Sequence, residues 1–230
     1  YLWGGERLKT EYHKQIDLTP LAETWECSTH PDGCSIVDSG AAAGKPLRTV
    51  LQEHPEYLGI YANSEGELPI LIKLIDAKKD LSVQVHPDDA YAKQYENGQN
   101  GKTEMWYVLE AEPDASLVYG FQHTMTPERL RQSLAEGTLE ADLQSVPVSK
   151  NDAFLIPAGT VHAIGAGILL AEIQQSSNLT YRLYDYNRTD ANGNKRPLHI
   201  EKAVATVDYQ QKPLPEQNRT VEQKDGYTEE

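Results

Sequence analysis

A series of short strand-like segments, separated by turn residues, most constrains the fold of this chain. Leu68–Asp76 and Leu81–His86 are apolar or alternate in polarity, and Pro87-Asp88-Asp89 follows the second of them. Alternation with a period of two is typical of a strand with two different faces. Further segments of this kind are Glu104–Leu109, Ala115–Phe121, Ala153–Pro157, Ile168–Gln174 and Leu179–Tyr186. The series predicts an antiparallel sandwich or barrel.

One segment within this series has the signals of a helix. Thr126 is suited to the N-cap, Pro127 to the first turn, and Gly137 to the end of the helix. The sequence therefore predicts a mainly β fold that carries a small helical insertion at about residues 126–145.

The domain boundaries follow from changes in residue character along the chain. We expect one domain over residues 1–209, with a helical and loop region at 1–66 and a barrel core at about 67–186. Residues 210–230 are polar and contain prolines, which is typical of a tail or of the start of a second half. Gly165-Ala166-Gly167 predicts a hairpin turn between two core strands.

Composition and charge exclude several classes of protein. The net charge is −14, whereas a nucleic-acid-binding surface requires clustered cations, so no nucleic-acid partner is expected. No apolar run approaches the roughly 20 residues that span a bilayer, so no membrane partner is expected either. Two cysteines do not make a disulfide scaffold, which favours a reducing, cytoplasmic location.

The strand Leu81–His86 carries the first candidate site residues. A period of two places Ser82, Gln84 and His86 on one face and three apolar residues on the other. In a closed barrel the polar face lines an interior site. A half-exposed strand with its polar face in water explains the same alternation, and this strand alone favours that simpler interpretation.

Two later segments add residues that ligate metals. Lys102 and Glu104 share one face at the start of a strand, and His162 follows a turn that begins at Pro157. Two imidazoles, a carboxylate and a further oxygen donor form a plausible set of four ligands for Zn²⁺. Fe(II), Mn(II) and Co(II) accept the same donors, and the amide of Gln84 is the weakest of the four.

The order of these motifs resembles the type I mannose-6-phosphate isomerase family. Ser82–Asp88 matches its Ser-x-Gln-x-His-Pro-Asp pattern, Lys102–Met105 its Lys-x-Glu-Met pattern, and Pro157–Ala163 its Pro-x-Gly-x-x-His-Ala pattern. Glu172 is followed ten residues later by Arg182, as in that family. The resemblance is to the short bacterial branch of this family, which belongs to the cupin superfamily. Cupins usually have His-x-His at the first motif, whereas this isomerase family has Gln-x-His.

The resemblance implies a fold, a cofactor and a reaction. The fold is a cupin jelly-roll barrel, and one Zn²⁺ per chain is held by Gln84, His86, Glu104 and His162. The reaction interconverts mannose 6-phosphate and fructose 6-phosphate through a cis-enediolate, so the partner is a small sugar phosphate. The residues implied for substrate binding are Lys73, Ser82 and Arg182, and those implied for catalysis are Arg182, Lys102 and Glu172.

Two positions depart from the family pattern and keep an alternative open. Ile164 stands where many relatives have tyrosine, and Asn178 stands where relatives often have an aspartate proposed to handle protons. An amide is not a general acid or base. A non-catalytic or differently specific cupin that binds a sugar phosphate is therefore the alternative, and we expect a monomer or weak homodimer in either case.

Overall fold

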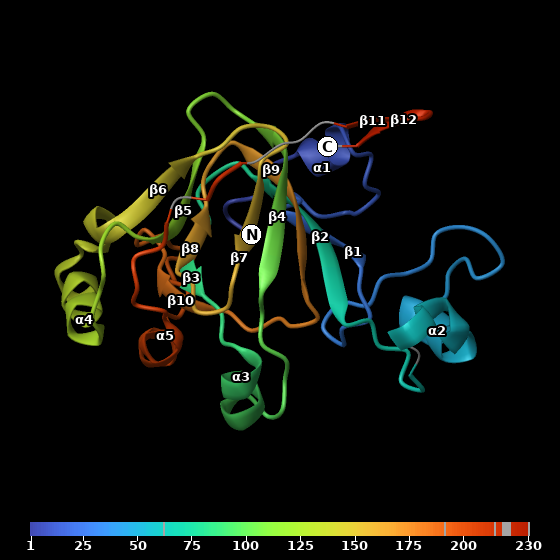
Figure 1. Cartoon of the computed structure of the whole chain (residues 1–230), viewed down its shortest axis with the longest axis horizontal. Helices are drawn as coiled ribbons and strands as arrows, with labels where there is room; N and C mark the ends of the chain where they lie inside the picture. The colour runs from blue at the N-terminus through green and yellow to red at the C-terminus, as the bar shows by residue number, and fades with distance from the viewer. Residues whose placement is uncertain (62, 191, 214, 218–221, 230) are drawn as a thin grey trace.

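Two five-stranded antiparallel sheets face each other in a computed structural model, which describes residues 1–61, 63–190, 192–213, 215–217 and 222–229 (Figure 1). The first sheet has the order β1 (Glu23–Cys27), β2 (Ile70–Ala77), β9 (Ile168–Gln175), β4 (Glu104–Ala111), β7 (Ala153–Ile156). The second has the order β10 (Tyr181–Tyr184), β3 (Val83–Val85), β8 (His162–Ile164), β5 (Ser116–Phe121), β6 (Leu143–Pro147). This confirms the mainly β jelly-roll architecture, although the pairings of the described strands do not join the sheets into one closed barrel.

The main hydrophobic core lies between the two sheets. Trp106 and Phe154 reach it from the first sheet, and Leu117 and Ile164 reach it from the second. All four are almost completely buried, so removal of their apolar surface from water favours the stacking of the sheets.

Helices cover the outer face of the second sheet. The apolar face of α4 (Pro127–Glu136) and residues of α5 (Ile200–Thr206) pack in one cluster with β3 and β10, at the left of Figure 1. The hydroxyl of Thr126 accepts a hydrogen bond from the amide of Arg129 at 3.1 Å, and Gly137 ends α4 with a φ of 70°. The predicted helix is thereby confirmed at both ends, although strand β6 begins at Leu143, within the insertion predicted at about residues 126–145.

Several elements lie outside the segments that the sequence indicated, β1 and β6 among them. The other elements are α1 (Arg7–Thr10), α2 (Leu47–Glu53), α3 (Asp89–Tyr95), the 3₁₀ helices Pro55–Tyr61 and Leu139–Asp142, and the hairpin of β11 (Glu222–Lys224) and β12 (Tyr227–Glu229). The hairpin lies in the predicted tail, of which residues 214, 218–221 and 230 are outside the described part. Within the described ranges, none of the helices is long and apolar enough to cross a membrane.

The predicted hairpin at Gly165–Gly167 is wrong. A turn does occur there, with Gly167 at a φ of 83°, but it joins β8 of the second sheet to β9 of the first. The chain passes so close to β5 that a side chain at Gly165 would place its Cβ 1.9 Å from the Ser116 carbonyl oxygen. Glycines indicate a turn, but they do not determine which strands pair on either side of it.

The strand registers align polar residues in two rows. In the second sheet, Arg182 lies opposite Gln84, which in turn lies opposite His162. In the first sheet, Lys73 lies opposite Glu172 and Glu172 lies opposite Trp106. The rings of Trp106 and His162 meet edge to face with centroids 5.4 Å apart, so the two rows approach each other between the sheets.

The short helix α1 is attached to the first sheet by a buried carboxylate. Asp76 of β2 is 1% exposed, and it accepts hydrogen bonds from the backbone amide of Arg7 at 2.9 Å and from its Nε at 2.7 Å. Breaking a buried ion pair on one side leaves the other charge without its partner.

We therefore expect Asp76→Ala to lower the free energy of unfolding by on the order of 3 kcal/mol. The matched control is Glu53→Ala, which removes an ion pair with Lys45 in which both side chains are 47% exposed, and it should cause no measurable change. Urea denaturation of the three proteins measures both effects. Equal stability of the two variants would show that the Asp76 contact does not anchor α1.

Candidate metal centre

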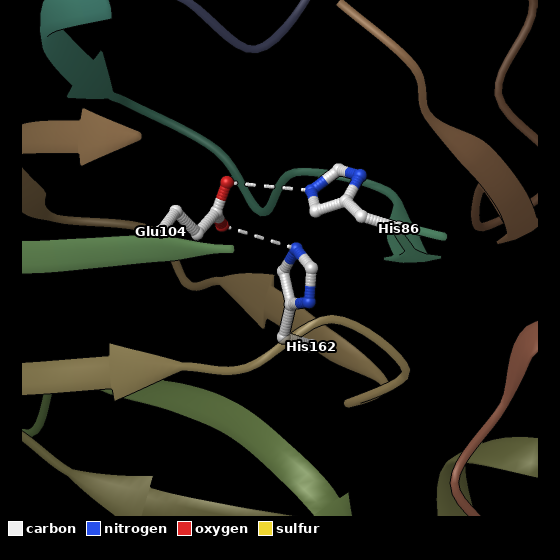
Figure 2. Close-up of side chains that lie close together, drawn as sticks. All are labelled: His86, Glu104 and His162. Carbon is white, nitrogen blue, oxygen red and sulfur yellow. Dashed lines mark ion pairs between the residues drawn. The ribbon is translucent and has the colours of Figure 1, made fainter. Parts of the chain in front are cut away.

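Three buried side chains from different strands converge between the sheets. His86 follows β3, Glu104 begins β4 and His162 begins β8, and each is at most 1% exposed. Nε2 of His86 lies 3.4 Å from Oε2 of Glu104, and Nε2 of His162 lies 3.3 Å from Oε1 (Figure 2). One potential ligand atom from each residue lies within 4.8 Å of the others.

Backbone carbonyls fix the orientation of both imidazoles. Nδ1 of His86 lies 2.8 Å from the carbonyl oxygen of Leu179, and Nδ1 of His162 lies 2.8 Å from that of Thr160. A carbonyl oxygen only accepts, so each Nδ1 carries the hydrogen and each Nε2 of a neutral ring presents a lone pair. Burial lowers the pKa of His86 to about 3 and lowers that of His162, so both rings are neutral near pH 7.

The donor set fits a divalent cation. Burial raises the pKa of Glu104, but the charge of Lys102 and other contributions outweigh burial and hold that pKa well below its usual range. Nζ of Lys102 forms an ion pair with Oε2 of Glu104 at 2.7 Å and lies 3.1 Å from Nε2 of His86, whereas Oε1 of Glu104 has no hydrogen-bond partner among the described residues. An ionised carboxylate therefore faces two nitrogen lone pairs, and a bound cation satisfies all of these acceptors at once.

Gln84 lies beside this cluster. Its Nε2 is 3.4 Å from Nε2 of His162, its neighbour across the β3–β8 pairing. The two ends of an amide are exchanged by a rotation of its terminal bond, and that rotation turns Oε1 toward His162. The structure thus brings together all four residues that the sequence indicated as ligands.

A second buried cluster adjoins the first. Nζ of Lys102 lies 2.7 Å from Oε2 of Glu104 and 3.7 Å from Oε1 of Glu172. Nζ of Lys73 lies 3.5 Å from the same Glu172 oxygen, and Nε1 of Trp106 donates a hydrogen bond to Oε2 at 3.1 Å. Burial and the charge of Glu104 raise the pKa of Glu172, whereas for Lys102 the neighbouring carboxylates outweigh burial and raise the pKa.

A cavity of about 280 Å³ opens onto the second cluster and onto Gln84, which lies beside the first. Its wall includes all of the residues that the sequence indicated for substrate binding or catalysis, together with one proposed ligand. These are Lys73, Ser82, Gln84, Lys102, Glu172 and Arg182. The predicted residues therefore form one connected site.

Arg182 is held at the wall of this cavity by two neutral groups. Its Nε donates to Oγ of Ser82 at 3.2 Å, and its Nη1 donates to the carbonyl oxygen of Pro197 at 2.8 Å. The structure therefore gives Ser82 an orienting contact with Arg182 in addition to its place in the wall.

The cavity wall also contains residues that sequence reasoning missed. Glu23 of β1 and Arg196 line it, and no role was assigned to either from the sequence. Glu23 lies in the segment Ala22–Glu26, which is similar to the N-terminal region of the family named above, and this similarity could have marked it. No motif marks Arg196. Asn178, the departure from the family pattern, also lines the cavity and donates a hydrogen bond to Asp32 at 3.1 Å.

Comparison with known proteins relates this site to a family. The model of the phosphomannose isomerase type I catalytic domain matches residues 1–116. Probable mannose-6-phosphate isomerase GmuF of Bacillus subtilis (strain 168) is 44% identical over 207 residues, which cover 90% of this chain and 64% of the relative. The chain thus spans somewhat less than two thirds of the length of this curated relative.

Solved structures agree with the sequence comparison. The crystal structure of the mannose 6-phosphate isomerase from Bacillus subtilis has a TM-score of 0.88 and 35% identity, and the match covers 99% of this chain and 71% of that one. A zinc-bound mannose 6-phosphate isomerase shares the fold, with a TM-score of 0.71, 20% identity, and coverage of 98% and 76%. This chain belongs to the type I phosphomannose isomerase family.

Proposed function

We propose that this chain is the catalytic part of a metal-dependent isomerase that interconverts mannose 6-phosphate and fructose 6-phosphate. The observation that carries the proposal is the ionised carboxylate of Glu104, which faces two neutral imidazoles beside a cavity lined by cations. The names of the related proteins support the same reaction.

The metal of this proposal is one Zn²⁺ per chain, held by Gln84, His86, Glu104 and His162. Two imidazoles, an amide and one carboxylate leave a site with a net charge of about +1 when Zn²⁺ is bound. A metal held by these residues would supply Lewis-acid stabilisation of negative charge on the sugar oxygens. The zinc-bound structure of the same fold supports this choice of metal.

The residues of the second cluster are placed to manage protons and charge. An aldose–ketose isomerisation moves a proton between adjacent carbons while charge develops on oxygen. The carboxyl group of Glu172 lines the cavity and is oriented by Trp106, so we assign proton transfer to it. Lys102 directs its ammonium group between Glu104 and Glu172, where it offsets the developing negative charge.

The other cations hold the substrate. Arg182 presents a planar fork that is suited to a phosphate group, and Ser82 fixes the orientation of this fork. Lys73 is 5% exposed and lies in the cavity wall next to Glu172, where it is suited to a sugar hydroxyl or a phosphate oxygen.

The proposal extends to the domain organisation, the assembly and the location of the protein. Residues 1–209 form the catalytic domain, and residues 210–230 are a tail or the start of a second half. The acidic net charge supports the absence of a nucleic-acid partner, and the small number of cysteines supports a cytoplasmic location. A monomer or weak homodimer remains the expected assembly.

The metal assignment predicts which side chains are required for zinc binding. We expect His162→Ala and Glu104→Gln to reduce bound zinc from about one ion per chain to near zero after dialysis, because the first removes a ligand atom and the second removes the only negative charge among the four ligands. The exposed His54→Ala is the matched control and should retain zinc. Elemental analysis of the folded proteins measures the content, and full zinc in Glu104→Gln would contradict the assignment.

The role of Glu172 predicts a loss of turnover without a loss of metal. Glu172→Gln keeps the shape of the side chain but removes its acid–base function, so kcat should fall by about 10²- to 10⁴-fold at unchanged zinc content. A coupled assay for fructose 6-phosphate formed from mannose 6-phosphate measures this effect, with the exposed Glu201→Gln as control.

Two other results of this assay would count against the proposal. An unchanged kcat in Glu172→Gln would remove this residue from the mechanism. If the zinc-loaded wild-type chain bound mannose 6-phosphate but did not convert it, the alternative of a non-catalytic sugar-phosphate-binding cupin would be correct.

A further inference from the structure

A buried carboxylate next to the cavity holds two arginines that the proposed mechanism does not use. Asp185 follows β10 and is 6% exposed. Arg196 donates from Nε to Oδ2 at 2.8 Å and from Nη2 to Oδ1 at 2.5 Å, which is a two-point contact that fixes the plane of the guanidinium. Arg188 donates to Oδ1 from Nε at 3.2 Å and also from Nη2.

Only one of these two arginines reaches the cavity. Arg196 lines the wall together with Arg182, whereas Arg188 is not a lining residue and donates instead to the backbone carbonyl of Asp80 at 2.5 Å. Two arginines that share one partner thus differ in their access to the site.

Arg182 and Arg196 both keep donors available. The contacts of Arg182 to Ser82 and Pro197 use its Nε and Nη1, and those of Arg196 to Asp185 use its Nε and Nη2. Within the described part of the chain, Nη2 of Arg182 and Nη1 of Arg196 have no hydrogen-bond partner. Both guanidinium groups line the same cavity, and burial together with the like charge of Arg196 lowers the pKa of Arg182. An anion placed against both groups relieves this repulsion.

The local charge matches a phosphate monoester. The two arginines that line this end of the cavity carry a charge of +2, while Arg188 offsets the charge of Asp185 behind them, and a sugar phosphate carries close to −2 at neutral pH. The acidic wall residues Glu23 and Glu172 lie on β1 and β9 of the opposite sheet. The cationic end is therefore built on the second sheet and the loop that follows it.

We propose that Arg196 is the second guanidinium of a phosphate-binding subsite formed with Arg182, and that Asp185 is the positioning residue that aims it. The sugar that carries the phosphate rests on the proposed function, whereas the subsite rests on the arginines themselves. Selectivity for a phosphorylated over a free sugar then depends on Arg196 and Asp185.

Calorimetric titration of the zinc-loaded chain with inorganic phosphate, mannose 6-phosphate and free mannose tests this subsite. Arg196→Gln should weaken binding of both phosphate compounds by about 10- to 100-fold and leave the affinity for free mannose unchanged, because hydrogen bonds to a charged group are lost. Arg188→Gln is the matched control, since it removes the other partner of Asp185, and it should change affinity by less than about threefold.

The positioning role of Asp185 has a separate readout. Asp185→Asn leaves one acceptor oxygen in place of two, so Arg196 loses its two-point contact but keeps its charge. We expect KM for mannose 6-phosphate to rise several-fold with kcat nearly unchanged, and Asp185→Glu to restore part of the affinity. Arg196→Lys keeps a cation without the fork and should bind with intermediate affinity, which provides a second variant should Arg196→Gln fold poorly.

The outcomes separate this inference from the proposed function. Unchanged phosphate binding in Arg196→Gln, or equal losses in Arg196→Gln and Arg188→Gln, would overturn the subsite. Binding that depends on Arg196 in a chain without isomerase activity would support the subsite and contradict the proposed reaction. Isomerase activity with a KM that does not depend on Arg196 would support the proposed reaction and contradict the subsite.

Discussion

The site depends on one electrostatic constraint. The ionised carboxylate of Glu104 is buried, and the two imidazole Nε2 atoms that face it cannot donate a hydrogen bond to it. The backbone carbonyls of Leu179 and Thr160 fix the two imidazoles with their Nε2 lone pairs toward this carboxylate. Lys102 lies 2.7 Å from Oε2 and offsets part of this charge, and a bound cation would satisfy Oε1 together with the Nε2 lone pairs. The surrounding cations and the placement of the strands follow from this requirement.

Strand register is the means by which the fold meets this constraint. His162, Gln84 and Arg182 occupy successive positions across the second sheet, so ligand and phosphate contacts are ordered along one row. The opposite row places Glu172 next to Trp106, whose ring meets His162. Because side chains in a strand alternate between faces, a shift of one residue in either register would remove these groups from the site.

Local motifs made the centre of this site predictable from the sequence. The ligand residues fall within short patterns of fixed spacing, such as Ser82–Asp88 and Pro157–Ala163, and helix α4 has both of its end signals. One residue in these motifs has a second structural role that the sequence analysis did not indicate. Asp88, which follows a predicted strand and ends the motif Ser82–Asp88, also accepts a hydrogen bond from the amide of Tyr91 and caps helix α3.

Contacts between distant segments explain what the sequence did not indicate. β1 pairs with β2, which lies nearly fifty residues later, and nothing within Glu23–Cys27 specifies that partner. Arg196 reaches the cavity only because a loop returns it to Asp185. The turn at Gly167 was correctly placed, but its strands belong to different sheets, since pairing is decided by the whole sandwich.

Reconstitution with zinc tests the central claim most directly. The chelated chain would be titrated with Zn²⁺ while bound zinc and the conversion of mannose 6-phosphate to fructose 6-phosphate are measured on the same samples. We expect no turnover without metal and a linear recovery of turnover that stops at about one zinc per chain. Turnover that persists in the metal-free chain, or that does not follow zinc occupancy, would contradict it.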